Sequence, residues 1–294
     1  MEKNKPGRVT CLRPLRKART STLLLIMICG LAPRAFAGPY DSAGQRATDW
    51  LAVNMVPADK TWGSELDLKY LVAAEVALGL ASWNRRSYEY YAALTWLSNL
   101  SPANVDFVSR RVLALGPGGQ NVDRDIDFLS AVQSLNLDAP GNGGLGLNAG
   151  YQGSPLDTAL ALQAYTQAAA TADVSASITA LKNAQLTGSD KGWVIGQETS
   201  SDPIITAQVL IALMPYRGSD PTLVTPIANG LAALNAKVGT SSATVKKALS
   251  ALANFRDTAS SSQAATLLGN LVATQGADGS WGGDVQATAV TLRA

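Results

Sequence analysis

Histidine is absent from the 294 residues of this chain, and cysteine occurs only at Cys11 and Cys29. Both cysteines fall within the first 37 residues, a segment with the composition of a secretory leader. The chain without this leader would therefore contain neither residue type. This composition excludes thiol nucleophiles, disulfide bonds, histidine-based catalytic triads and the common zinc sites. We accordingly expect no metal site and no cofactor.

Charged residues are also scarce, at 16% of the chain against 47% hydrophobic residues. The first 37 residues hold eight Lys or Arg and one Glu, so the remainder has 16 basic and 21 acidic residues. The basic character of the whole chain is therefore a property of its leader. An acidic remainder gives no indication of a polyanionic partner such as nucleic acid.

The N-terminal segment has the three parts of a signal peptide. A basic start is followed by the apolar run Leu23–Leu31 and then by the small-x-small sequence Ala35-Phe36-Ala37. The apolar run is too short to span a membrane. We therefore expect a signal peptide at 1–37, cleaved after Ala37, and a secreted or periplasmic protein without a membrane span.

A short motif recurs along the rest of the chain with a period near 43 residues. It consists of an acidic or amide residue, two spacers, a large apolar residue and usually glycine. The apolar positions are Trp62, Leu145, Trp193, Val238 and Trp281. The first gap is nearly twice the others, which predicts a sixth, eroded unit around Asn99–Ala103. Such a period indicates a repeat architecture.

Each unit predicts two helices of different character. The second helices are rich in alanine and short aliphatic residues, as in Asp157–Leu162, Ile205–Leu210 and Ala287–Leu292. Small residues let helices crowd into an inner ring, whereas the more polar first helices suit an outer ring. Closure of the ring would leave no exposed repeat end. We therefore predict an all-α fold, an α/α toroid of about six helical hairpins in one domain spanning 38–294. The last predicted helix stops after barely three turns, which is compatible with a domain truncated at its C-terminus.

The last unit carries the residues of a known motif. Gln275, Gly279 and Trp281 match Gln-x-x-x-Gly-x-Trp, and Arg46–Leu51 matches its upstream pattern of basic, small, two spacers, aromatic and aliphatic. This resembles the QW-type repeats of the prenyltransferase and squalene oxidase type, found in terpenoid cyclases and protein prenyltransferase β subunits. The resemblance implies an α/α toroid whose Trp and Gln side chains fasten neighbouring hairpins. The residues to which it assigns this structural role are Trp50, Trp62, Gln133, Trp193, Gln275 and Trp281.

The chemistry of that family does not transfer to this chain. The nearest approach to the Asp-x-Asp-Asp motif of proton-donating cyclases is Asp123–Asp127, which lacks the adjacent Asp pair and opens a predicted outer helix. Acidic residues are favoured there by the helix dipole. The prenyltransferase zinc site needs Cys and His, the thioester domains of complement-like proteins need Cys, and squalene-type cyclases need a second barrel. The resemblance thus implies a fold without an assigned activity.

The mouth of a closed toroid is expected at the turns that precede the inner helices. The polar candidates there are Glu65, Tyr151, Asp157, Glu198 and Asp284. Tyr151 lies on the glycine-rich loop 139–154, where an aromatic ring can stack on a ligand. We expect this loop to form one wall, with Tyr151 and Asp157 inward and Glu198 facing them. The alternatives are a loop splayed over the outside, and carboxylates that only solvate turns or cap helices.

Three interpretations of function follow. The first is an exported, non-catalytic binding module for an apolar, glycan or protein ligand, which needs no chemistry that the chain lacks. The second is an enzyme of the terpenoid cyclase/prenyltransferase-like or glycan-cleaving toroid class, using carboxylates and tyrosine without zinc. The third is one module of a longer surface protein, which is compatible with both others. The missing Cys, His and Asp-x-Asp-Asp motif favours the first.

Overall fold

A computed structural model describes residues 39–63, 65–135, 143–170, 174–257 and 260–294. The expected leader and residues 139–142 of the glycine-rich loop lie outside these ranges. Within them the chain forms twelve α helices and three short 3-10 helices, and its only β pairing is in two isolated bridges. The all-α prediction is confirmed.

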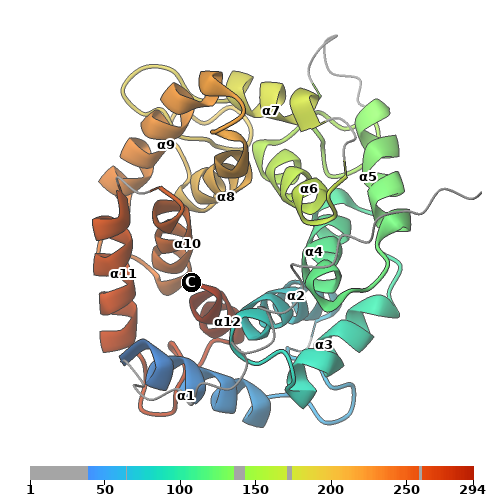
Figure 1. Cartoon of the computed structure of the whole chain (residues 1–294), viewed down its shortest axis with the longest axis vertical. Coiled ribbons are helices and arrows are strands. Elements are labelled where there is room, and N and C mark those ends of the chain that lie inside the picture. The colour runs from blue at the N-terminus through green and yellow to red at the C-terminus, as the bar shows by residue number, and fades with distance from the viewer. Residues whose placement is uncertain (1–38, 64, 136–142, 171–173, 258–259) are drawn as a thin grey trace, which may run out of the picture. The chain divides into compact units, whose positions relative to one another are not determined.

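The helices alternate between two concentric rings (Figure 1). The outer helices are α1 (Pro39–Val53), α3 (Tyr88–Ser98), α5 (Asp123–Ser134), α7 (Val174–Asn183), α9 (Val224–Lys237) and α11 (Ser261–Ala273). The inner helices are α2 (Leu66–Trp83), α4 (Val105–Leu115), α6 (Pro155–Gln167), α8 (Pro203–Leu213), α10 (Thr244–Phe255) and α12 (Val285–Arg293). The 3-10 helices are η1 (Gly116–Gly118), η2 (Met214–Tyr216) and η3 (Pro221–Leu223). The predicted toroid of six hairpins is therefore present, and α3–α4 is the unit expected around Asn99–Ala103.

The inner ring closes where its first and last helices meet. Each inner helix contacts the next, and α12 packs along α2. Gly79 allows this close approach, because a Cβ there would lie 2.8 Å from the carbonyl oxygen of Ala289. On the outer side of the contact, Trp83 Nε1 donates a hydrogen bond to the Leu292 carbonyl oxygen at 2.7 Å. Close backbone packing and this partly buried hydrogen bond join the two ends of the domain.

Three tryptophans of the repeat make the same contact. Each indole N–H donates to a carbonyl oxygen in the last turn of the preceding outer helix. The carbonyl oxygens of this turn have no N–H partner within the helix. The pairs are Trp62 with Leu51 at 2.8 Å, Trp193 with Leu181 at 2.7 Å, and Trp281 with Leu271 at 2.7 Å. All three rings are buried, whereas Trp50 within α1 is only partly buried against the core. Each buried indole thus covers the end of an outer helix.

One glutamine in the last turn of α5 and another just after α11 join neighbouring hairpins. Gln133 Nε2 donates to the Gly143 carbonyl oxygen of its own loop at 2.6 Å and to Ser177 Oγ of the next outer helix at 2.9 Å. Gln275 Nε2 donates to the Gly279 carbonyl oxygen at 2.8 Å and to the Ala43 carbonyl oxygen at 2.9 Å. The contact with Ala43 closes the outer ring between α11 and α1.

A threonine in three inner helices completes the repeat and was not expected from the sequence. Its hydroxyl accepts a hydrogen bond from the backbone N–H of the apolar residue in the preceding loop. The pairs are Thr158 with Leu145 at 2.9 Å, Thr206 with Trp193 at 3.0 Å, and Thr288 with Trp281 at 3.1 Å. The Thr-Ala pair that recurs in these helices was the signal available in the sequence.

None of the described helices combines the length and apolar character of a membrane span.

Candidate functional site

A cavity of about 380 Å³ lies on the axis of the ring. All six inner helices line it, represented in order by Leu78, Leu113, Gln163, Ile211, Leu252 and Arg293. A space lined by every member of a closed ring must lie at its centre. Its other lining residues belong to the last turns of the inner helices or to the segments that follow them. We call this space the axial cavity; it is at the C-terminal ends of the inner helices.

The charge of the axial cavity is positive. Arg85, Arg256 and Arg293 line it, and the described lining residues include no Asp or Glu. Arg85 Nε donates to the Ala81 carbonyl oxygen at 2.6 Å, and Arg256 Nη1 donates to the Ile211 carbonyl oxygen at 3.0 Å. Across the described residues, neither Arg85 nor Arg256 takes part in an ion pair. A guanidinium has five N–H donors, so both retain donors for a ligand.

A buried ion cluster adjoins the axial cavity. Glu75 Oε1 accepts a hydrogen bond from Arg110 at 2.9 Å, and Glu75 Oε2 lies 3.4 Å from Arg293 Nη1. Arg110 also pairs with Asp106. Burial lowers the pKa of Arg110, but the charges of Asp106 and Glu75 outweigh it and the net shift is upward. The two carboxylates of Glu75 and Asp106 thus balance the two guanidinium groups of this cluster. Arg85 and Arg256 remain as uncompensated positive charges of the axial cavity.

Arg256, which follows α10, is affected by Arg293, the last residue of α12. Desolvation by the surrounding protein lowers the pKa of Arg256, and the positive charge of Arg293 lowers it further. Arginine nevertheless stays protonated in proteins. An anion beside Arg256 and Arg293 would offset the uncompensated charge of Arg256, and guanidinium groups bind carboxylate or phosphate by paired N–H donors. The arrangement therefore favours an anionic group.

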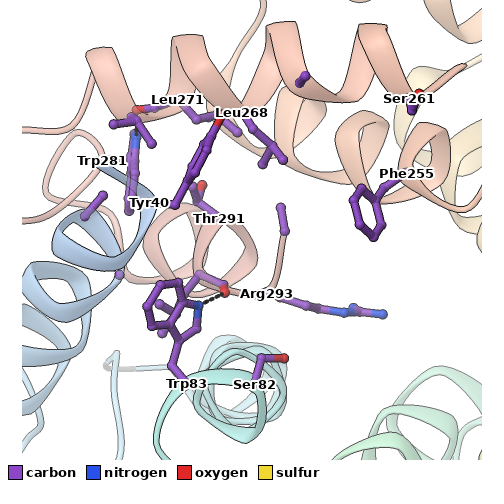
Figure 2. Close-up of a pocket in the computed structure, with 16 residues that line it drawn as sticks. Tyr40, Ser82, Trp83, Phe255, Ser261, Leu268, Leu271, Trp281, Thr291 and Arg293 are labelled. Atoms are coloured by element: carbon purple, nitrogen blue, oxygen red, sulfur yellow. Dashed lines mark hydrogen bonds between the residues drawn. The ribbon is translucent and has the colours of Figure 1, made fainter. Parts of the chain in front are cut away.

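A second cavity, of about 480 Å³, lies between the first and last hairpins. Figure 2 shows its walls, which include Tyr40, Trp83, Phe255, Leu268, Trp281 and Arg293. Most of the other lining residues are apolar. We call this space the seam pocket. Ser82 and Arg293 line both the seam pocket and the axial cavity, so the two spaces adjoin.

The residues expected at the mouth lie at the opposite ends of the inner helices. Glu65 and Asp284 are the N-cap residues of α2 and α12, Tyr151 and Glu198 are exposed on the loops before α6 and α8, and Asp157 is buried in the first turn of α6. Within the described residues, no hydrogen bond or ion pair joins any two of the five. None of them lines the axial cavity as described.

The observed contacts of two of these residues are those of helix caps. Asp284 Oδ1 accepts from the Ala287 backbone N–H at 2.6 Å. Ser154 Oγ accepts from the Asp157 backbone N–H at 3.0 Å and donates to Asp157 Oδ2 at 2.6 Å. Burial raises the pKa of Asp157 and the hydrogen bond from Ser154 offsets part of the rise. The Asp157 carboxyl therefore holds its proton to a higher pH than a free Asp side chain does.

The described part of the glycine-rich loop packs on the inner ring. The Val105 backbone N–H at the start of α4 donates to the Leu147 carbonyl oxygen at 2.9 Å. A third cavity, of about 420 Å³, separates residues 152–154 of this loop from residues 194–197 of the next one. Tyr151 is 57% exposed, and neither it nor Glu198 is among the residues described around that cavity.

Sequence reasoning missed the three arginines of the axial cavity. Arginine in or after the last turn of a helix is ordinarily a partner of the helix dipole. A weak signal exists, because each arginine lies one or two residues after a bulky apolar residue near the end of an inner helix, namely Trp83, Phe255 and Leu292. Only the closed ring shows that these helix ends converge.

Comparison with solved structures identifies similar folds at low sequence identity. A protein from Actinoplanes has a TM-score of 0.67 and 16% identity, over 86% of this chain and 98% of that one. A variant of the type II terpene cyclase MstE from Scytonema has a TM-score of 0.66 and 13% identity, over 87% and 95% of the two chains. Another MstE variant, in complex with geranylgeranyl dihydroxybenzoate as substrate, has a TM-score of 0.63 and 13% identity, over 87% and 96%. No protein-family model and no curated protein sequence matches the chain. These likenesses support a terpenoid-cyclase-like toroid fold.

Proposed function

We propose that this terpenoid-cyclase-like toroid is a non-catalytic binding module whose ligand places an anionic group in the axial cavity. The observation that carries the proposal is the set of three arginines around a cavity whose described lining has no acidic side chain. A cavity of this size, lined by apolar residues such as Leu78 and Ile211 together with converging polar groups, has the general form of a small-molecule site.

The enzymatic alternative rests on a different residue. Asp157 is buried and its pKa is raised, as expected for a carboxyl that supplies a proton. MstE, which shares the fold, has been solved with an isoprenoid substrate. Against this role, the Asp157 carboxylate is hydrogen-bonded to the Ser154 hydroxyl at the start of its own helix. An activity that is lost in Asp157→Asn while anion binding persists would favour the enzyme.

The repeat assignment and export are part of the proposal. We take Trp62, Trp193 and Trp281, with Gln133 and Gln275, as QW-type repeat residues, and their recurring hydrogen bonds support this assignment. Export of the domain 38–294 rests on the sequence of the leader. N-terminal sequencing of protein secreted by a Gram-negative-type host should give Gly38 as the first residue, and an intact Met1 in the cytosol would contradict export.

The binding proposal is tested by calorimetric titration with inorganic pyrophosphate at low ionic strength. We expect the Arg85→Gln/Arg256→Gln double variant to bind at least about tenfold more weakly, because charge-assisted hydrogen bonds are lost. Arg86→Gln/Lys191→Gln is the matched control, since it removes the same charge from exposed residues outside the described lining of the cavity. Equal affinity in both double variants, or no binding by the wild type, would refute the axial site.

A further inference from the structure

The third cavity, of about 420 Å³, plays no part in the proposed function. Residues of the loop before α6, of the first turn of α6, of the end of α7 and of the loop before α8 line it. α7 lies on the outer ring between these two inner helices (Figure 1). We call this space the interloop cavity. It is at the N-terminal ends of the inner helices and so lies away from the axial cavity.

The interloop cavity is polar but uncharged. Three amide side chains line it, each from a different segment: Gln152, Asn183 and Gln197. The buried side chains of Leu181 and Val194 give it an apolar floor. The described lining residues include no Asp, Glu, Lys or Arg. An ion would lose hydration there and gain no counter-charge, which disfavours a charged ligand.

The three amides of the interloop cavity have unused hydrogen-bonding capacity. Each carboxamide has two N–H donors and an acceptor oxygen. Within the part of the chain that the structure describes, no hydrogen bond or ion pair involves the side chain of Gln152, Asn183 or Gln197. All three residues are exposed, so their amides are open to solvent. A ligand that displaces this solvent must bring groups that both donate and accept hydrogen bonds.

The walls of the interloop cavity are held by contacts within the protein. Trp193 Nε1 donates to the Leu181 carbonyl oxygen at 2.7 Å, which fastens the loop before α8 to the end of α7. The Asp202 backbone N–H donates to the Trp193 carbonyl oxygen at 2.9 Å. In the other loop, a Cβ at Gly146 would lie 2.4 Å from the Gln152 carbonyl oxygen, so glycine allows the two sides to meet. A preformed site of this kind saves the entropic cost of ordering it on binding.

We infer that the interloop cavity binds an uncharged N-acetylated amino sugar. The N–H and C=O of an acetamido group pair with a carboxamide such as that of Asn183 or Gln197, and its methyl group suits the apolar floor. The sugar hydroxyls meet the remaining amide. A purely apolar ligand would leave all three amides without partners. This site is independent of the anion site in the axial cavity.

An extended peptide carries the same amide groups but fits the interloop cavity less well. Extended peptides commonly add to the exposed edge of a sheet. The described part of the chain has only two isolated bridges, between Val56 and Thr61 and between Trp281 and Asp284, and none of these four residues lines the cavity. The cavity therefore offers a peptide no strand edge with which to pair.

The test compares N,N′-diacetylchitobiose with cellobiose by NMR titration of the ligand signals. The two disaccharides share a backbone of linked glucose units, and cellobiose has hydroxyl groups in place of the acetamido groups. We expect diacetylchitobiose to bind at least about tenfold more tightly, because its amide hydrogen bonds and methyl contact are absent from cellobiose. N-acetyl-alanyl-alanine methylamide is the peptide probe and should bind more weakly than diacetylchitobiose.

A double variant locates the site. Asn183→Leu/Gln197→Met keeps the approximate size of both side chains and removes their hydrogen bonds, so diacetylchitobiose should bind at least about tenfold more weakly. Asn99→Leu/Gln120→Met is the matched control, because both residues are exposed and neither is among the described lining residues. In saturation-transfer NMR, the acetyl methyl protons should receive the strongest transfer from the protein.

The outcomes separate this site from the axial cavity. Equal affinity for cellobiose, no binding of either disaccharide, or an unchanged affinity in Asn183→Leu/Gln197→Met would overturn the inference. A peptide probe that binds as tightly as diacetylchitobiose would overturn the choice of an amino sugar. Arg85→Gln/Arg256→Gln should leave the affinity for diacetylchitobiose unchanged, so failure of this inference would leave the anion site standing.

Discussion

The substitution Glu75→Gln probes the buried ion cluster and the charge of the axial cavity together. Glu75 is 2% exposed and contacts both Arg110 and Arg293. Glutamine keeps the shape and one acceptor oxygen but removes the negative charge. Arg110 would retain Asp106, whereas Arg293 would lose its one carboxylate partner among the described residues. The change should therefore destabilise the fold and make the axial cavity more positive.

The expected magnitude follows from the burial of the cluster. Breaking a buried ion pair by removal of one partner costs about 3–5 kcal/mol, because the other charge stays buried and uncompensated. Arg110 keeps a second carboxylate and glutamine keeps an acceptor, so we expect the lower end, about 3 kcal/mol. Pyrophosphate should bind more tightly to this variant than to the wild type, because one more uncompensated guanidinium faces the cavity.

The assay is urea unfolding followed by far-UV circular dichroism at pH 7 and low ionic strength, with pyrophosphate titration of the folded variant. Lys69→Gln is the comparison, because it breaks the more exposed pair with Asp59 and should cost about 0.2–1 kcal/mol. A Glu75→Gln protein with an unchanged free energy of unfolding and unchanged pyrophosphate affinity would refute the cluster as the source of both effects.

Three further predictions concern the frame of the toroid. Trp281→Ala should lower the free energy of unfolding by roughly 3–5 kcal/mol in urea titrations, because it removes a buried ring and its bond to Leu271; an unchanged value would show that the ring is dispensable for the fold. Gly79→Ala should cost about 1–3 kcal/mol, because its Cβ would clash with Ala289 at the ring closure, and a more stable variant would contradict this packing. Burial raises the pKa of Asp190, but hydrogen bonds from its lysine and serine partners outweigh it and the net pKa is lowered. A lowered pKa stabilises the folded state above the ordinary Asp value near 3.9, and this contribution is lost as pH falls through the folded-state pKa. Asp190→Asn should therefore flatten the fall in stability below about pH 4, and an unchanged pH profile would contradict the assignment.

The fold was predictable because one short motif recurs in five of the six hairpins. The spacing of Trp62, Trp193 and Trp281 indicates the period of the repeat. The small residues of the second helix in each unit predict that these helices form the inner ring. Even the eroded unit around Asn99–Ala103 was located by its gap. The first helix begins at Pro39, because proline and an acidic residue suit a first helical turn.

The candidate site was not predictable because its residues converge only in the closed ring. Arg85, Arg256 and Arg293 come from three different hairpins, and nothing in the sequence shows that the ends of α2, α10 and α12 meet on one axis. Their positions near helix C-termini have an ordinary electrostatic explanation. Sequence reasoning instead favoured glycine-flanked polar residues such as Tyr151, which lie at the other ends of the inner helices.

A crystal structure of the protein with pyrophosphate tests the axial site most directly. The account predicts electron density for the anion in the axial cavity, with its oxygens within hydrogen-bonding distance of the guanidinium groups of Arg256 and Arg293. Density for the anion at the opposite ends of the inner helices, beside Tyr151 or Asp157, with the axial cavity unchanged, would contradict it.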